Sequence, residues 1–130
     1  MNEFSKALTV SASAMRAQAT RLRHVSENIS NADTPGYRRK TVSFETERGG
    51  ARDTATVAVG RVGYDKSDPT TVFDPAHPLA DDNGHYKGSN VNLLVEIADA
   101  REAQRSYEAN LKMFDQARQM STSLMGLLQK

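Results

Sequence analysis

The three histidines, His24, His77 and His85, are the first residues whose side chains could bind a metal ion, since the chain contains no cysteine. His24 lies among arginines, and His77 and His85 lie in a segment rich in Gly, Pro and Asp. None of them has the i, i+4 spacing with which two histidines on one helix bind zinc. We interpret all three as surface histidines, and the sequence therefore predicts neither a metal site nor a cofactor.

The stretch LADDNG has the composition of a calcium loop. If Gly84 is aligned with the turn glycine of such a loop, Asp81 and Asn83 fall at the third and fifth ligand positions. The first position is then Leu79, and the twelfth is Asn90, where a bidentate glutamate is required. The pattern fails at its two strongest ligands, so we predict a plain turn.

Covalent chemistry has little support in the sequence. No serine stands in a nucleophile elbow, and there is no Gly-rich phosphate loop. Asn28, Ile29 and Ser30 match a glycosylation sequon, but they lie in a helical pattern without a secretory signal nearby. A small hydrolase that uses scattered residues such as Asp81 and His77 stays open as an alternative.

The densest cationic run is Arg38, Arg39 and Lys40. The net charge is only +1, and Glu45 and Glu47 follow closely, which argues against a dedicated binder of nucleic acid or lipid headgroups. We interpret the run as a face that contacts solvent or another subunit.

A long helix is predicted over residues 3–31, because this segment contains neither Gly nor Pro. Leu8, Met15, Leu22 and Ile29 recur at every seventh position, which is typical of a narrow helix–helix seam. About 29 residues would make a rod of about 43 Å. So thin a stripe needs a partner helix.

A second helix is predicted from Val91 onward, because no Gly or Pro follows until Gly126. Asn90 is expected to cap its N-terminus. Apolar residues at 3–4 spacing predict a second seam, so the partner helix is expected in the same chain. The members of this seam are Leu93, Ile97, Ala100, Tyr107, Leu111, Phe114, Met125 and Leu128.

The middle of the chain has a different texture, rich in Gly and Pro. Alternating valines predict a strand within residues 54–64, and shorter strands are expected at 41–45 and 70–73, with a loop over 74–89. Such a segment is too short for a robust core of its own.

The predicted fold is therefore mainly α with a small β-rich insertion, in an elongated subunit whose long N- and C-terminal helices pair as an antiparallel coiled coil. Residues 1–36 plus 90–130 form this discontinuous core, and residues 37–89 form the insertion. Aromatic residues make up only 6% of the chain and tryptophan is absent, so a compact monomeric core is not expected.

A sharp stop separates the first helix from the insertion. Thr34 precedes Pro35, which moves it out of the α region, and Asn31 tolerates the left-handed conformation that ends a helix. Pro35 and Gly36 suit the central positions of a type II turn. Tyr37 would follow directly from this tight corner.

Two long stretches carry a resemblance to a known family. VSENISNADTPGYRRKTVSFE resembles the N-terminal signature of bacterial flagellar axial proteins, the rod, hook and hook-associated subunits. FDPAHPLADDNGHYKGSNVNLLVEIADAREAQRSYEANLKMF is similar to the C-terminal region of the flagellar basal-body rod family, in its proximal rod branch.

This resemblance implies a structural subunit of the bacterial flagellar basal body, without catalytic activity. The paired terminal helices would form an axial core around a central export channel, in a rod that spans the periplasm. Implied partners are other copies, other rod subunits, the inner-membrane ring, the rod-base adaptor and the flagellar type III export apparatus, with no nucleic acid and no small-molecule substrate. The expected hinge and assembly residues are Asn28, Ile29, Asn31, Thr34, Pro35, Gly36, Tyr37 and Arg38.

Two further expectations concern export and folding. The N-terminus lacks the apolar core and cleavage site of a secretory signal, and the resemblance implies export without signal cleavage. Ordering the backbone costs about 1–2 kcal/mol per residue, which neither thin stripe can recover, so we expect folding to be coupled to assembly. The alternative from another class is a soluble coiled-coil adaptor or helical regulator that binds a partner helix or nucleic acid.

Overall fold

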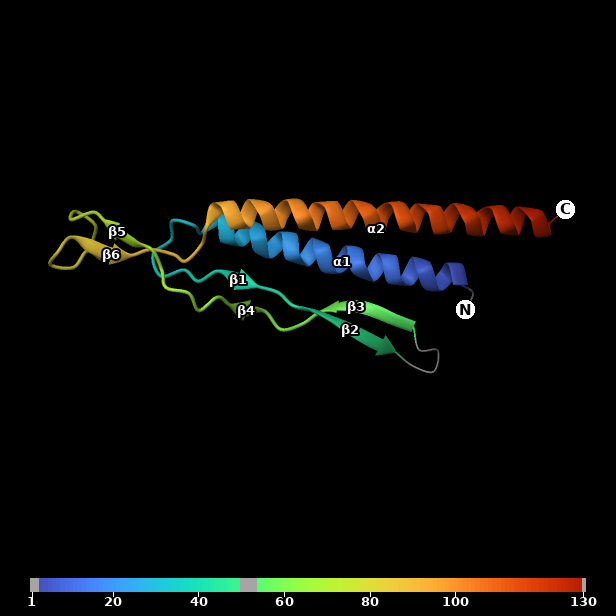
Figure 1. Cartoon of the computed structure of the whole chain (residues 1–130), viewed down its shortest axis with the longest axis horizontal. Helices are drawn as coiled ribbons and strands as arrows, with labels where there is room; N and C mark the ends of the chain where they lie inside the picture. Colours follow the sequence, from blue (N-terminus) through green and yellow to red (C-terminus); the bar gives the residue numbers. More distant parts are fainter. Residues whose placement is uncertain (1–2, 50–53, 130) are drawn as a thin grey trace.

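The computed structural model describes residues 3–49 and 54–129, and these form two long helices joined by short strands. In Figure 1 the helices lie side by side and antiparallel along the long axis of the molecule, and the strands lie beneath them and beyond one end. The elements are α1 (Glu3–Ser30), β1 (Lys40–Thr41), β2 (Phe44–Gly49), β3 (Thr54–Val59), β4 (Gly63–Tyr64), β5 (Thr71–Phe73), β6 (His85–Lys87) and α2 (Leu93–Leu128). The predicted fold class, mainly α with a small β-rich insertion, is confirmed. Residues 1, 2 and 130 of the predicted core lie outside the described residues.

The two helices differ in length and in how they begin. α1 has 28 residues and α2 has 36, and the C-terminal end of α2 runs past the start of α1 (Figure 1). The N-cap of α2 is Asn92, whose side chain accepts a hydrogen bond from the Leu94 N–H at 3.0 Å. The prediction that Asn90 is the cap is therefore wrong, because the Asn90 side chain is bound to the insertion instead. Neither described helix carries an apolar stretch long enough to cross a membrane.

Small side chains form the buried contact along the helix pair. Among the described residues, the buried hydrophobic side chains are Ala17 and Val25 of α1 and Ala103 and Ala117 of α2. Small residues let two helix backbones approach closely, but each of them removes little apolar surface from water. The helix pair therefore has a thin core, as the composition predicted.

The larger residues of the two predicted seams lie mostly at the margins of this contact. Leu8, Met15, Leu22, Tyr107 and Phe114 are half-buried. Ile29, Leu93, Ile97, Leu111, Met125 and Leu128 are exposed. The buried residues of α2 are Glu96, Ala103 and Ala117, and the assignment of the larger residues to helix seams stays a prediction.

The insertion forms two arms. In the first, β1 pairs with β4 and β2 with β3, all antiparallel, and this arm folds back along α1 (Figure 1). The Val57 N–H of β3 donates to the Ser13 hydroxyl of α1 at 3.0 Å, which ties the arm to the helix. The strands predicted at 41–45 and 54–64 are present, but each is divided into two shorter strands.

The second arm is the β5–β6 hairpin, which projects beyond the helix ends (Figure 1). The expectation of a loop over 74–89 is wrong in part, because β6 pairs with β5 there. His77 stacks on Tyr86 with ring centroids 3.9 Å apart, and Phe73 lies against His85 at 5.0 Å. These ring contacts stabilise a hairpin that has little other burial.

The predicted turn at Gly84 is confirmed. Gly84 has a φ of +81° and donates its N–H to the Asp81 carbonyl at 3.0 Å. The Asp81 carboxylate accepts the N–H groups of His85 at 3.0 Å and Asn83 at 2.9 Å. These hydrogen bonds, that of His85 first, hold the pKa of Asp81 below its ordinary value. Asp81 is thus a capping residue of the hairpin.

This geometry predicts an acid-sensitive hairpin tip. Because the pKa of Asp81 is lowered in the folded state, its contribution is complete above the ordinary aspartate pKa of about 4 and is lost as the pH falls through the lower folded value. The amide chemical shift of His85 should report this acid titration, and Asp81→Asn should abolish it. Asp82→Asn is the matched control and should leave it in place; an unchanged titration in Asp81→Asn would contradict the capping role.

Candidate functional site

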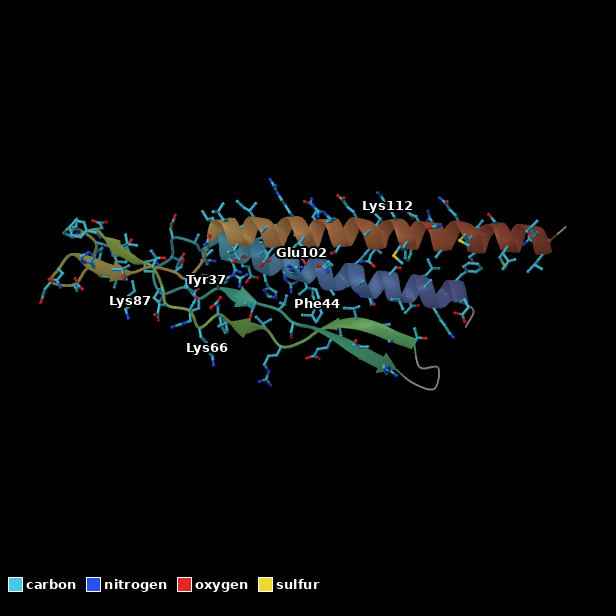
Figure 2. The ribbon with its side chains drawn as sticks, viewed as in Figure 1. Tyr37, Phe44, Lys66, Lys87, Glu102 and Lys112 are labelled. Carbon is cyan, nitrogen blue, oxygen red and sulfur yellow. The ribbon has the colours of Figure 1, made fainter. Side chains whose placement is uncertain are left out.

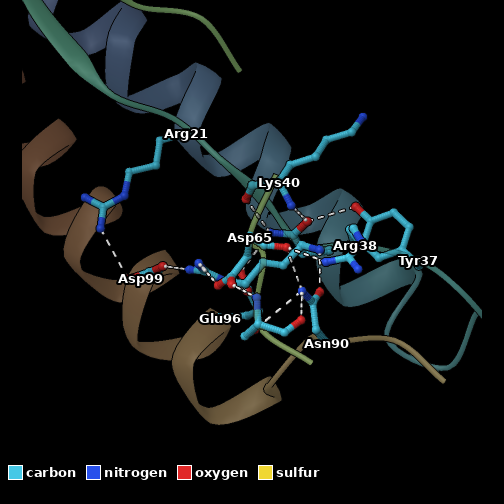
Figure 3. Close-up of polar contacts among 11 residues, drawn as sticks. Arg21, Tyr37, Arg38, Lys40, Asp65, Asn90, Glu96 and Asp99 are labelled. Atoms are coloured by element: carbon cyan, nitrogen blue, oxygen red, sulfur yellow. Dashed lines mark hydrogen bonds and ion pairs between the residues drawn. The ribbon is translucent and has the colours of Figure 1, made fainter. Parts of the chain in front are cut away.

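A cluster of polar side chains lies where α1, α2 and the insertion meet. We call it the polar joint, and it comprises Asn28, Tyr37, Arg39, Lys40, Asp65, Asn90, Glu96 and Asp99. Figure 3 labels Tyr37, Lys40, Asp65, Asn90, Glu96 and Asp99 of this cluster. Figure 2 places Tyr37 at the level where the insertion leaves the helix pair. The joint brings together parts of the chain that are far apart in sequence, because Asn28 and Glu96 are in direct contact.

Asn28 is the centre of the joint and is 1% exposed. Its Oδ1 accepts the Tyr37 hydroxyl at 2.8 Å and the Lys40 N–H at 2.9 Å. Its Nδ2 donates to the Lys40 carbonyl at 3.0 Å and to Glu96 Oε2 at 3.2 Å. The side-chain amide thus pairs with the backbone of Lys40 as a neighbouring strand would, and fixes the start of β1 on α1.

Glu96 is the most deeply buried charged group among the described residues, at 0% exposure. It accepts from Asn28 and also forms an ion pair with Arg39 Nε. Arg39 Nη2 lies 2.6 Å from Asp99 Oδ2, and Nη1 lies 3.6 Å from Asp65 Oδ2. Burial lowers the pKa of Arg39, but the hydrogen bond to Glu96 and the acids around it raise it by more. The guanidinium therefore stays charged and links α2 to Asp65, which follows β4, while Arg39 itself directly precedes β1.

Asn90 closes the joint from the other side. Its Oδ1 accepts the Arg39 N–H at 2.6 Å, and its Nδ2 donates to the carbonyls of Asp65 at 2.9 Å and Ser67 at 3.2 Å. The Asp65 N–H in turn donates to the Arg39 carbonyl at 2.8 Å. The segment that leads into α2 is in this way bound to both β1 and β4.

The side chains of the cationic run at residues 38–40 bind to acidic side chains and carbonyl groups of the same chain. Lys40 Nζ lies 2.6 Å from Glu27 Oε2, and this hydrogen bond lowers the pKa of Glu27 and raises that of Lys40. Arg39 is paired as described above, whereas Arg38 is exposed and donates to the Asp65 carbonyl at 3.2 Å. The interpretation of this run as a face for solvent or another subunit is therefore wrong for Arg39, whose side chain is mostly buried, and it stays a prediction for Arg38.

The predicted turn precedes the joint. Tyr37 N–H donates to the Thr34 carbonyl at 3.1 Å, and Gly36 has a φ of +75°, as the third residue of a type II turn requires. Gly36 N–H donates to the Gly88 carbonyl at 3.2 Å, and the Ser89 hydroxyl donates to the Ala32 carbonyl. The corner is thereby bound to the base of the second arm.

The histidines and the sequon are accounted for by the fold. His24 is buried, so its interpretation as a surface histidine is wrong; its Nδ1 lies 3.8 Å from the Glu27 carboxylate. No group of three or more His, Asp and Glu side chains within residues 3–49 and 54–129 is arranged to hold a metal ion. Asn28 has both ends of its amide bound, so in the folded chain it is no acceptor for a glycan.

Sequence reasoning named Asn28 and Tyr37 but missed Glu96, Arg39 and Asn90 as one cluster. Glu96 lies in the first turn of α2, where an acid is usually explained by the helix dipole. The available signal was its spacing: Glu96, Ala103, Asn110 and Ala117 recur at every seventh position. A charged residue in line with buried alanines indicates a buried ion pair.

Comparisons with known proteins match both ends of the chain. The family model "Flagella basal body rod protein" matches residues 8–38, and "Flagellar basal body rod FlgEFG protein C-terminal" matches residues 82–127. The flagellar basal-body rod protein FlgC of Agrobacterium fabrum is 46% identical, over 98% of this chain and 97% of its own length. FlgC of Salmonella typhimurium is 32% identical, over 91% of this chain and 92% of its own length. FlgC of Bacillus subtilis is 35% identical, over 80% of this chain and 84% of its own length.

The geometry of the joint predicts a large effect of Asn28→Ala. The substitution leaves the Lys40 N–H without its acceptor and Glu96 Oε2 without its donor, although Glu96 keeps its ion pair with Arg39. Loss of these buried hydrogen bonds costs about 1–3 kcal/mol. Hydrogen exchange at the Lys40 amide of the folded chain should accelerate by about 10- to 100-fold. Asn31→Ala is the control, because the Asn31 amide donates locally to the Glu27 carbonyl, and Lys40 exchange should not change. Equal exchange rates in the two variants would show that Asn28 does not hold β1.

Proposed function

The chain belongs to the FlgC family of flagellar basal-body rod proteins, and we propose that its two terminal helices become fully ordered only when they pack against neighbouring subunits. It is a structural subunit of the proximal rod, it assembles with other rod subunits, and it is not an enzyme. Coupled folding is the mechanism by which the subunit would enter the rod.

The observation that carries this proposal is the unpartnered apolar surface of α2. Leu94 is 78% exposed and Leu128 is 75% exposed, and large apolar residues are exposed along both halves of the helix. The further exposed members are Leu93, Val95, Ile97, Leu111, Met113, Met120, Leu124, Met125 and Leu127. So many large apolar side chains exposed on one helix of a lone subunit favour contact with other proteins.

The thin core of the helix pair supports the same proposal. Its buried apolar side chains within the described residues are three alanines and one valine, which recover little of the entropy lost by ordering two helices. Contacts of the exposed seam residues with neighbouring subunits would supply the difference. On this proposal Ile29, Leu93, Ile97 and Leu111 belong to intersubunit seams.

We further propose the environment that this mechanism requires. The chain would be exported unfolded by the flagellar type III apparatus without loss of a signal peptide, and would fold in the part of the rod that spans the periplasm. Its other proposed neighbours are the inner-membrane ring and the rod-base adaptor. On this proposal residues 1–36 and 90–130 would face the axis of the rod, and residues 37–89 would face outward.

Coupled folding predicts a difference between the free and the assembled subunit. The dilute, purified full-length chain should show a low helix content by circular dichroism, with fast hydrogen exchange in α1 and α2. On polymerisation or on addition of adjacent rod subunits, the helix content should rise and hydrogen exchange in α1 and α2 should slow down. Terminal helices that are fully protected in the dilute monomer would refute coupled folding, while leaving the family assignment intact.

The turn at residues 34–37 is proposed as the hinge between helix and insertion, and Gly36→Val tests it. A β-branched residue at a φ of +75° is strained by about 1–3 kcal/mol, although a Cβ there would meet no heavy atom within 4 Å. Expression should be normal, and motility and the amount of the variant in isolated basal bodies should fall.

The matched control for the hinge is Gly49→Val. A Cβ at Gly49 also meets nothing within 4 Å, but Gly49 lies in β2 without a positive φ, so valine suits it. Normal motility of Gly36→Val, or an equal loss in both variants, would count against the hinge.

A further inference from the structure

The contact between α1 and α2 nearly repeats itself after one heptad. On the inner face of α2, Ala103, Asn110 and Ala117 are seven residues apart, and so are Tyr107 and Phe114. In a slip of α2 by one heptad, about 10.5 Å, Asn110 and an alanine take each other's place, and Tyr107 or Phe114 takes the place of the other. The buried apolar side chains of the described pair are three alanines and one valine, so apolar packing opposes such a slip only weakly.

The repeat breaks at Glu96, since the residue seven positions further along α2 is Ala103. Glu96 is held by Asn28 at 3.2 Å and by Arg39, and Arg39 follows α1 closely in the chain, so both partners move with α1. A slip in one direction brings Ala103 opposite Asn28. A slip in the other direction brings the segment before α2 there. In both cases Asn28 and Arg39 lose the carboxylate.

We infer that the Glu96 carboxylate, bound by Asn28 and Arg39, selects the one register in which α2 pairs with α1. A buried charge without its partner is costly, whereas an apolar replacement for a buried ion pair is often neutral for stability. A single buried polar residue is known to fix register in coiled coils for this reason. The inference requires only that the two helices pair, and it holds whether pairing precedes or follows assembly.

The register also sets where the insertion lies. Asn90 binds the Arg39 N–H and the Asp65 carbonyl just before α2 begins. These bonds form only when the start of α2 reaches the end of α1. A slipped pair would therefore carry displaced arms, and its exposed seams would no longer match those of correctly paired neighbours.

The experiment uses engineered cysteines, which are unambiguous because the chain has none. Ala7 and Ala117 line one groove between the helices, so Ala7→Cys with Ala117→Cys reports the observed register. Ala7→Cys with Asn110→Cys, or with Leu124→Cys, reports a slip of one heptad in either direction. Disulfide formation within one subunit is read on denaturing gels of basal bodies from cells in which the variant replaces the native chain.

The test substitution is Glu96→Leu, which removes the carboxylate but keeps an apolar side chain that favours helix. The parent chain should form the observed-register cross-link alone. In Glu96→Leu the ratio of slipped to observed-register cross-link should rise by about tenfold or more. Glu102→Leu is the matched control, because Glu102 is exposed and bonds Arg21 at 3.4 Å, and it should behave as the parent. Identical cross-links in Glu96→Leu and Glu102→Leu would overturn the inference.

Cross-linking also decides the case in which Glu96→Leu is not incorporated into basal bodies. The same pairs are then read in the purified full-length chain, in trimethylamine N-oxide at a concentration that makes the parent chain helical. Mixed registers at the helix content of the parent support the inference. A single observed register, or a loss of helix content, overturns it, because Glu96 would then contribute to stability without selecting the register.

Discussion

The ion pair between Glu96 and Arg39 is the interaction on which the arrangement of this subunit depends. It joins the first turn of α2 to the residue that directly precedes β1, and the Glu96 carboxylate in this site is closed to water. Asn28 adds the end of α1 to the same cluster. Three segments that have few apolar contacts with one another are thus held by a small number of directional bonds, which specify geometry more sharply than apolar contacts do.

Beyond this cluster, the helix pair is held mainly by a weakly buried apolar contact. The buried apolar residues of the described helix pair are mainly alanines, but larger apolar residues of α2 remain on the surface. The subunit therefore has a well-defined joint at one end and a weakly buried helix pair along the rest of its length. That distribution suits a member of the FlgC family, because a rod subunit must present apolar surface to its neighbours and still fix the angle of its insertion.

The sequence predicted what depends on local chemistry and periodicity. The two helices, the turn at Pro35 and Gly36, and the turn at Gly84 follow from residues adjacent in the chain, and the structure contains all three. The strand β6 and the cap at Asn92 were missed, because the pairing of β6 with β5 and the use of Asn90 by the insertion depend on tertiary contacts. The polar joint was only half predicted, since nothing near Glu96 in sequence shows that Arg39 will be its partner. The buried alanines Ala17, Ala103 and Ala117 were not among the predicted seam residues, because the seams were assigned mainly from large apolar side chains.

The unequal lengths of the two helices give the molecule two unlike ends. At one end α2 continues alone as a single helix with exposed leucines, and the opposite end of the molecule is formed by the β5–β6 hairpin (Figure 1). A body of this shape is directional, so copies that meet end to end do so through different surfaces. Contacts of that kind are heterologous, and where the rotation between copies does not close a ring they build an open polymer whose two tips are chemically distinct. Such a polymer can accept new subunits at one tip while the other stays anchored.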